Sequence, residues 1–451
     1  MQARNSLFLV LLALVSLSST AFAANHPWYT EGKFKPDTRI VVTLVNPLDI
    51  ARESCPVMIT PDQMPNVNLY EHAVTVVDPA LPPRPEPSKE LLGRQGVHQL
   101  RGETNGRFLP YQLDDLNKDG LWDELFFMAD FAPNERKTIH LYIGKTQRGW
   151  VEHGTYAGLG SYCRRTVPWW ESKDIGWKLW YTTDCDLYGK RERVLMAADT
   201  LTKNLNGYGV PYDHGSDIMS VSSSFGAGGM CLFEDPAHPE ITSRARFSPY
   251  AGKGPMEDAR FAQHVVVNGP LRSIIRVHTM HWRTGNGEYE LEQLYTAYKD
   301  KNYSTCQVNF LNYAPSNPQT QFGCGIRKIM EEFKCVQKGG MVISCGSGAE
   351  ISDPDDDQDY GRITIDFVGT ALVVKDAYQP QYQFVPTEKE NHCFRIPASK
   401  DRSFEYMIAG AWSEGSVLKT AEEFESFVRK SALEYNNPIV STDFDTESKA
   451  K

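Results

Sequence analysis

The chain has 451 residues and a formal net charge of −10, and it contains no block of basic residues. This charge balance argues against a nucleic acid as partner. Nine cysteines lie far apart with no C-x-x-C pair, which excludes a zinc framework and leaves room for one or two disulfides. The length exceeds that of one usual domain, so we expect a large and a small domain.

The N-terminus predicts a secretory signal over residues 1–23. Arg4 supplies a positive charge, Leu7–Leu17 form an apolar run, and Ala21 and Ala23 mark a small-x-small cleavage site. The apolar run is too short for a membrane anchor, and polar chain follows it at once. We therefore expect a periplasmic or secreted protein without a membrane anchor.

Residues 24–149 predict a small β-sandwich. Arg39–Asn46 is rich in β-branched residues, as strands are, whereas the Pro-rich stretch Ala80–Lys89 is unsuited to a central strand. Asn117–Gly120 places Asp-Gly between two apolar runs, which is a strong hairpin signal. The same turn resembles a calcium loop, but its twelfth position is Phe126 instead of a bidentate Glu. We predict a plain hairpin turn and no bound metal.

Residues 150–440 predict a larger all-β domain made of two packed sheets. Long alternating runs such as Leu271–Arg283 support this fold class. A single helix is expected near the C-terminus, because Thr420 and Glu423 form a capping box ahead of an apolar i, i+3, i+4 pattern. The polar residues 441–451 are expected to form a flexible tail.

The segment Trp177–Gly229 concentrates the groups that can move protons or hold an anion. If its first part is one half-buried strand, alternate residues point the same way, and one face collects Asp184, Asp186, Tyr188 and Lys190. The structural alternative is an ion-pair ladder on the outer face of that strand.

This segment suits elimination chemistry. Removal of a proton next to a carboxylate requires a base, a positive group that stabilises the enolate and an acid for the leaving oxygen. We predict that one of His214 and Tyr188 serves as the base and the other as the acid, and that Lys190 or Arg191 is the positive group. Aromatic side chains suit a sugar ring, and the predicted substrate-binding residues are Trp180, Tyr181, Asp186, Arg191 and Glu292.

Three glutamates form a second candidate. Glu288, Glu290 and Glu292 share one face of a predicted strand, and neighbours in such a row lie about 7 Å apart. That spacing is compatible with an inverting glycoside hydrolase. Hydrolase carboxylates usually come from different segments, however, so a charged sheet face is the alternative. His278 and His281 would point to opposite faces of a regular strand, so they would not bind one metal together.

Several motifs together resemble the secreted bacterial family filed as domain of unknown function 4861. They are LNKDGLWDELFFMADFAPNERKT, CDLYGKRERVL, DHG with SFGAGG, and NGPLRSIIRV followed by E-x-E-x-x-Y-T-A-Y-x-D. The resemblance covers nearly the whole chain after the signal. It implies a galactose-mutarotase-like supersandwich and a role in glycan utilisation, where at least one relative is linked to oligosaccharide dehydration in uronate-rich, ulvan-type breakdown.

The resemblance also implies roles for residues. The family's loop histidine corresponds to His214, and its D-x-Y-G-K motif corresponds to Asp186, Tyr188, Gly189 and Lys190. TTDC precedes this motif where relatives tend to carry an arginine, so Arg191 or Arg193 would neutralise the substrate carboxylate. The implied activity is a lyase or dehydratase that acts on uronic-acid-containing oligosaccharides without a cofactor. A glycoside hydrolase and a non-catalytic glycan-binding protein remain the alternatives.

Overall fold

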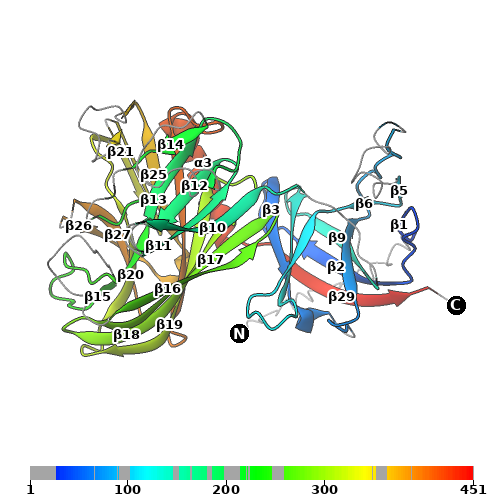
Figure 1. Cartoon of the computed structure of the whole chain (residues 1–451), viewed down its shortest axis with the longest axis horizontal. Helices are drawn as coiled ribbons and strands as arrows, with labels where there is room; N and C mark the ends of the chain where they lie inside the picture. Colours follow the sequence, from blue (N-terminus) through cyan, green and yellow to red (C-terminus); the bar gives the residue numbers. More distant parts are fainter. Residues whose placement is uncertain are drawn as a thin grey trace, which may run out of the picture.

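The structure of the protein, a computed structural model, is mostly β and has two lobes (Figure 1). It describes residues 27–64, 67–88, 90, 102–145, 152–162, 165–179, 185–197, 214–219, 221, 224–245, 259–347, 349–351, 363–386 and 389–449. The predicted signal, residues 1–23, lies outside them. The predicted all-β class with antiparallel sheets and a C-terminal helix is confirmed.

The smaller lobe is a sandwich of two antiparallel sheets around its own core. Apolar alternation explains the strands, since Ile40, Val42 and Leu44 of β2 are all buried on one side. The five-stranded sheet consists, in order, of β29 (Val440–Ser448), β2 (Thr38–Val45), β9 (Arg136–Gly144), β4 (Ala73–Asp78) and β6 (Arg107–Phe108). The three-stranded sheet consists of β3 (Arg52–Ile59), β8 (Glu124–Phe131) and β7 (Tyr111–Asp114).

The predicted turn at Asn117–Gly120 joins β7 and β8, which pair as an antiparallel hairpin. Its carboxylates act as acceptors for backbone N–H groups. Asp115 accepts from Lys118 at 2.6 Å, and Asp123 accepts from Leu116 at 2.7 Å. Asn117 and Asp119 each accept the N–H two residues further on, at 2.8 Å, as in an Asx turn.

The expected flexible tail is wrong for most of residues 441–451. Strand β29 pairs with β2 through a register that runs from Val45↔Val440 to Thr38↔Ser448. The polar side chains of this segment show no strand pattern in the sequence. It is a strand nevertheless, because edge pairing depends on backbone hydrogen bonds more than on apolar side chains. Glu447 adds an ion pair with Arg39 at 2.6 Å. Figure 1 shows β29, in red, lying in the smaller lobe next to β2.

The larger lobe is built on an eight-stranded antiparallel sheet. In order, its strands are β16 (Arg260–Asn268), β17 (Arg272–Arg283), β18 (Gly287–Tyr298), β19 (Tyr303–Pro315), β28 (Ser403–Trp412), β25 (Val368–Val374), β22 (Met341–Gly346) and β21 (Glu332–Lys338). The long alternating runs predicted as strands therefore form the centre of one sheet.

Two smaller sheets pack on one face of the eight-stranded sheet and share one core with it. The five-stranded sheet has β10 (Thr155–Tyr162), β11 (Arg165–Ser172), β12 (Ile175–Leu179), β13 (Cys185–Lys190) and β14 (Gly215–Asp217). The four-stranded sheet has β15 (Gly229–Phe233), β20 (Gln321–Arg327), β27 (Asn391–Ile396) and β26 (Gln381–Val385). The covering layer is therefore divided into two sheets, whereas the sequence predicted one.

Helix α3 (Ala421–Asn436) packs on the other face of the eight-stranded sheet, as predicted. Thr420 caps it, because its hydroxyl accepts the N–H of Glu423 at 3.2 Å and the Glu423 carboxylate accepts the N–H of Thr420 at 3.2 Å. Phe424 and Val428 are buried against side chains of β22, β25 and β28. The remaining elements are β1 (Thr30–Glu31) with β5 (Glu103–Thr104), β23 (Ala349–Ile351) with β24 (Ile363–Ile365), and the 3-10 turns η1 (Pro61–Gln63) and η2 (Asp376–Tyr378).

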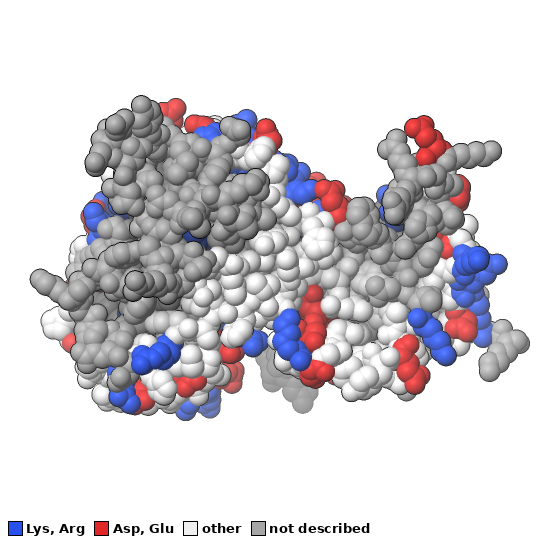
Figure 2. Space-filling model, viewed as in Figure 1, with Lys and Arg blue, Asp and Glu red and all other residues white. Residues whose placement is uncertain are grey.

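The two lobes are joined by buried polar contacts. Gln112 of β7 accepts the backbone N–H groups of Leu271 and Arg272 at 2.9 and 3.0 Å, and Arg272 pairs with Asp114 at 2.7 Å. No helix among the described residues is long and apolar enough to span a membrane. The eight cysteines at described positions form no disulfide with one another. On the face shown in Figure 2, acidic and basic side chains lie close to one another, without a field of one sign.

Candidate active site

The segment expected as one strand is a hairpin of two. Strands β12 and β13 pair with Trp177 opposite Leu187 and with Lys178 opposite Asp186. Trp177, Leu187 and their neighbours Leu179 and Cys185 do face the core, as the alternation predicted. The prediction of a single strand was wrong because parity alone does not show whether two apolar runs are continuous or folded back on each other.

The other face of this hairpin collects four polar side chains, which we call the Tyr188 cluster: Lys178, Asp186, Tyr188 and Asp217. The ammonium of Lys178 donates to the hydroxyl of Tyr188 at 2.5 Å and lies 3.1 Å from the carboxylate of Asp186. Asp217 comes from β14, directly opposite Tyr188, and the two side chains are hydrogen-bonded. Each of the four is more than nine-tenths buried. Four titratable groups are thus in direct contact.

Burial and the neighbouring carboxylate of Asp186 raise the pKa of Asp217 to about 8. A carboxyl group with a pKa of about 8 keeps its proton at neutral pH, and here the negative charge of Asp186 favours that neutral form. Lys178 opposes the rise in pKa, since its positive charge favours the ionised form. The cluster therefore holds a carboxylic acid beside a phenol and an ammonium, which is a set suited to proton transfer.

Trp169 of β11 adds an aromatic wall. Its ring centroid lies 4.2 Å from that of Tyr188, and its indole N–H is buried without a hydrogen-bond partner. Lys178 stands opposite Trp169 in the ladder of β11 and β12. A buried polar group that lacks a partner is uncommon, and here it lies beside the proton-transfer groups, where a ligand oxygen would satisfy it.

Lys190 does not join this cluster. Its ammonium is fully buried, forms an ion pair with Glu171, and donates to the carbonyls of Ser172 at 2.5 Å and Val194 at 2.7 Å. All three of its N–H donors are therefore used within the protein. Burial lowers the pKa of Lys190, and Glu171 opposes that shift. The geometry is that of a structural ion pair, contrary to the predicted catalytic role.

His214 and Arg191 lie at the surface end of β13. The ring of His214 is about half exposed, and its Nδ1 lies 3.2 Å from the carboxylate of Glu192. Arg191 pairs with Glu414 and lies 5.0 Å above the ring of Trp412. Neither contacts the Tyr188 cluster, so the structure does not bring the predicted catalytic residues together. The predicted residues Trp180 and Tyr181 lie outside the described residues.

The three glutamates of β18 each face a basic side chain of β17. The distances are 3.6 Å from Glu288 to Arg283, 2.7 Å from Glu290 to His278, and 3.8 Å from Glu292 to Arg276. They form the charged sheet face that the sequence analysis named as the alternative. Each carboxylate thus has a polar partner on β17, as expected of a structural sheet face.

One group in the described part of the chain has a donor set suited to zinc. Glu332 and Cys335 of β21 and His392 of β27 place their ligand atoms within 4.8 Å of one another. His392 is already satisfied, because its ring nitrogens are hydrogen-bonded to Glu332 at 2.9 Å and to Tyr382 at 2.8 Å. A metal would have to replace the bond to Glu332, and the group is stable as a hydrogen-bonded network.

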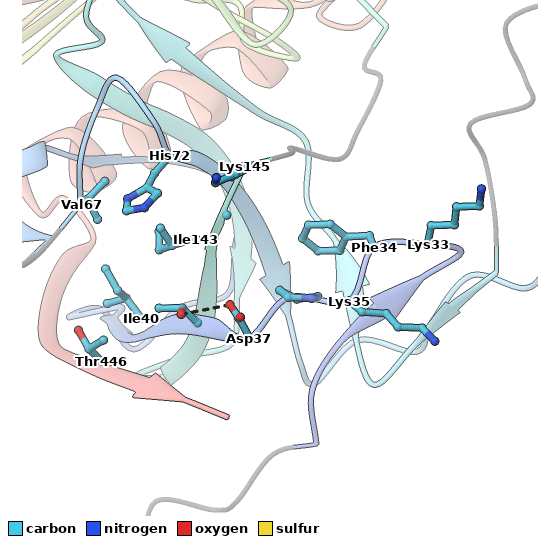
Figure 3. A pocket seen from close by; sticks show the side chains of 13 residues that line it. Lys33, Phe34, Lys35, Asp37, Ile40, Val67, His72, Ile143, Lys145 and Thr446 are labelled. Atoms are coloured by element: carbon cyan, nitrogen blue, oxygen red, sulfur yellow. Dashed lines mark hydrogen bonds between the residues drawn. The ribbon is translucent and has the colours of Figure 1, made fainter. Parts of the chain in front are cut away.

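A pocket of about 490 Å³ lies away from this chemistry, in the smaller lobe (Figure 3). Ile40 and Ile143 form its apolar side, with His72 beside them, while Lys33 and Lys35 point outward. Its basic side chains are exposed, and it lacks the close donor and acceptor pair of the Tyr188 cluster. Volume alone does not make it an active site.

Sequence reasoning found Asp186 and Tyr188 but missed Lys178, Asp217 and Trp169. Lys178 would have been found by folding the segment back on itself, since the antiparallel register sets it opposite Asp186. Asp217 follows the loop of His214, and only its pairing with β13 places it at Tyr188.

Comparison with known proteins gives distant structural likenesses. One is an alpha-mannosidase from Enterococcus faecalis V583, with 9% identity, a TM-score of 0.44, and coverage of 92% of this chain and 46% of that one. Another is a protein in glycosyl hydrolase family 38 from Enterococcus faecalis, with 9% identity, a TM-score of 0.45, and coverage of 92% and 48%. This chain spans less than half the length of either, and such distant likenesses decide nothing about activity.

No curated protein matches the chain. A family model described as Domain of unknown function (DUF4861) matches residues 90–440. The match includes the strands that carry the Tyr188 cluster and covers well over half of the sequence. The chain therefore belongs to the DUF4861 family.

Proposed function

We propose that the protein is a carbohydrate-active lyase or dehydratase that acts by elimination on uronic-acid-containing oligosaccharides. The observation that supports this most directly is the contact of 2.5 Å between Lys178 and Tyr188, next to a carboxyl group that keeps its proton at neutral pH. Elimination needs a base that has lost its proton and an acid that has kept one. The groups of the cluster lie in different environments, as such a division of roles requires.

In the proposed reaction Tyr188 is the base. The ammonium of Lys178 stabilises negative charge on its phenolic oxygen, and burial strengthens that attraction. The phenolate takes the proton from the carbon next to the sugar carboxylate. The electrons of that C–H bond form a carbon–carbon double bond, while the carbon–oxygen bond at the adjacent carbon breaks.

Asp217 is the acid in this scheme. It gives its proton to the departing oxygen, which leaves as an alcohol from a glycosidic bond or as water from a hydroxyl. Tyr188 is then protonated and Asp217 ionised. Their hydrogen bond allows the proton to pass from Tyr188 back to Asp217, which restores both groups without an external reagent. Trp169 would present its unpaired N–H and its ring to the substrate.

The structural alternative is a buried ion-pair network that merely stabilises the sheet. All four side chains are buried, so the proposed function requires this face of the five-stranded sheet to open when substrate binds. Product analysis separates the two. A lyase product has a new double bond that absorbs in the ultraviolet, a dehydratase product has lost one water, and a hydrolase product has gained one.

The test is incubation with a panel of saturated and unsaturated uronate oligosaccharides, read by mass spectrometry. We expect cleavage without added water or the loss of one water, and we expect Lys178→Met to abolish it. Gain of water that persists in Lys178→Met but disappears in Glu292→Gln would establish the hydrolase instead. Binding of the panel without any change in mass would identify a glycan-binding protein.

A further inference from the structure

The outer face of the four-stranded sheet carries arginines without acidic partners. Along β20, Phe322, Cys324 and Ile326 point into the shared core. The alternate residues therefore point to the opposite side, and Arg327 is the last of them. On the neighbouring strand β27, Arg395 lies on this same outer face, since it pairs with Gly323. We call Arg327 and Arg395 the arginine pair.

Arg327 is buried without a counter-ion. It is 7% exposed, its Nε is buried without a hydrogen-bond partner, and no described residue forms an ion pair with its guanidinium. Burial alone lowers its pKa, with no carboxylate acting against that shift. Its backbone N–H is used, donating to the carbonyl of Gly226 at 2.8 Å. Among the described residues, no side chain therefore balances the positive charge of Arg327.

Arg395 also lacks a carboxylate partner among the described residues. Its Nη2 donates to the side-chain oxygen of Gln381 at 3.3 Å, its Nε is buried without a partner, and no carboxylate among the described residues pairs with it. Along β20 the two arginines are separated by four residues, from Gly323 to Arg327, which corresponds to about 13 Å. The two arginines therefore lie on the same face of the sheet, offset by about this length along β20.

Other arginines of the larger lobe form ion pairs with carboxylates. Arg193 pairs with Asp174 at 2.7 Å, and Arg272 pairs with Asp114 at 2.7 Å. An unpaired guanidinium in a buried position is strongly disfavoured, because it loses hydration without gaining an ion pair. A fork of N–H donors in that state matches the oxygens of a carboxylate or a sulfate.

We propose that the arginine pair binds the oxyanion groups of an acidic oligosaccharide, with Arg327 as the principal contact. The inference rests on the proposed function for the sugar nature of the ligand, whereas anion binding itself needs no turnover. The proposed elimination also calls for a cation that neutralises the substrate carboxylate. Lys190 and Arg191, predicted for this role, are paired with Glu171 and Glu414.

Binding is tested by isothermal titration calorimetry with three probes on the full chain: an oligogalacturonate, a sulfated dextran oligosaccharide and neutral dextran. We expect the first, the second or both to bind, and neutral dextran not to bind. Arg327→Gln should weaken binding by about tenfold or more, since hydrogen bonds to a charged group are lost. Arg395→Gln should weaken it less. The control is Arg429→Gln on α3, where the arginine is paired with Glu425.

A stability measurement excludes a merely structural role. Arg327→Met keeps the packing of the aliphatic stem and removes the unbalanced charge, so we expect an unchanged or raised melting temperature without ligand. The oligogalacturonate should raise the melting temperature of the parent and not that of this variant. A marked loss of stability in Arg327→Met, or equal affinity of parent and Arg327→Gln, would overturn the proposal. Failure of both anionic probes to bind the parent would do the same.

The elimination proposal and the anion-binding proposal can be tested independently of each other. Tyr188→Phe should lose turnover and keep anion binding. If the parent binds the oligogalacturonate through Arg327 and turns over nothing, the arginine pair stands and the elimination proposal falls. If turnover occurs and Arg327→Gln leaves KM and kcat unchanged, elimination stands and the arginine pair is not its binding site.

Discussion

At the residue scale, Tyr188 is the side chain on which the proposed chemistry depends. Tyr188→Phe removes one oxygen and little packing, while the ring contact with Trp169 is retained. We expect turnover to fall by about two or more powers of ten, as for other general acid–base groups, with a modest loss of stability because Lys178 and Asp217 lose a buried hydrogen-bond partner. The matched control is Tyr156→Phe, a tyrosine packed against the same aromatic cluster. Equal losses in both variants would contradict a specific role for Tyr188.

Lys190 is expected to be structural. Lys190→Met leaves the carboxylate of Glu171 buried without its cation, so the free energy of unfolding should fall by about 3–5 kcal/mol. Urea denaturation measures this loss. Lys173→Met, which removes a more exposed lysine paired with Glu152, should change stability by less than about 1 kcal/mol. A variant at Lys190 with full stability and no turnover would restore the catalytic interpretation.

The raised pKa of Asp217 predicts that both the rate of turnover and the stability of the fold depend on pH. Its pKa is raised from 3.8 to about 8, so the folded state holds a proton that the unfolded state has lost between these values. Stability from this group is therefore present below pH 4 and is lost as the pH rises through about 8. As the acid of the reaction, it should also lose activity above about pH 8.

Asp217→Asn tests both effects. The parent should lose more stability between pH 4 and 8 than this variant, and the alkaline limb of its kcat/KM profile should report the ionisation of Asp217. The variant should show little activity at any pH. A parent profile that is flat from pH 6 to 10 would remove Asp217 from the mechanism.

At the element scale, β29 returns the chain to the smaller lobe and covers the edge of β2. Deletion of residues 440–451 exposes that edge and leaves Arg39 without Glu447. We expect a loss of roughly 2 kcal/mol or more in the free energy of unfolding, because several backbone hydrogen bonds and a charged partner are lost. Deletion of residues 450–451 alone is the control, since it keeps β29 and the N–H of Lys449, which donates to the carbonyl of Asp37 at 2.9 Å. Equal melting temperatures for the two truncations would show that β29 contributes nothing to stability.

At the scale of the whole molecule, the compartment remains a prediction. The charged, apolar and small-residue parts of residues 1–23 predict export with cleavage after Ala23 or close to it. N-terminal sequencing of the protein from the periplasm or medium should therefore begin near Ala24. Exported protein that still starts at Met1 would contradict this prediction.

The chain itself determined the features that depend on local pattern. Alternation specified the strands of the large sheet, Asp-Gly specified the β7–β8 hairpin, and the box of Thr420 and Glu423 specified the start of α3. Each of these rests on contacts within a few residues or on burial of one face. A sequence read in order shows both kinds of information directly.

Only the tertiary structure decided the site. Antiparallel pairing set Lys178 opposite Asp186 and Asp217 opposite Tyr188, burial assigned Lys190 to Glu171, and the polar end of the chain became an edge strand. Parity along the chain tells which side of a strand a residue faces, but register between strands decides which charges meet. The alternation of polar residues along the chain therefore predicted a polar face. The pairing of the strands determined which groups on that face are in contact.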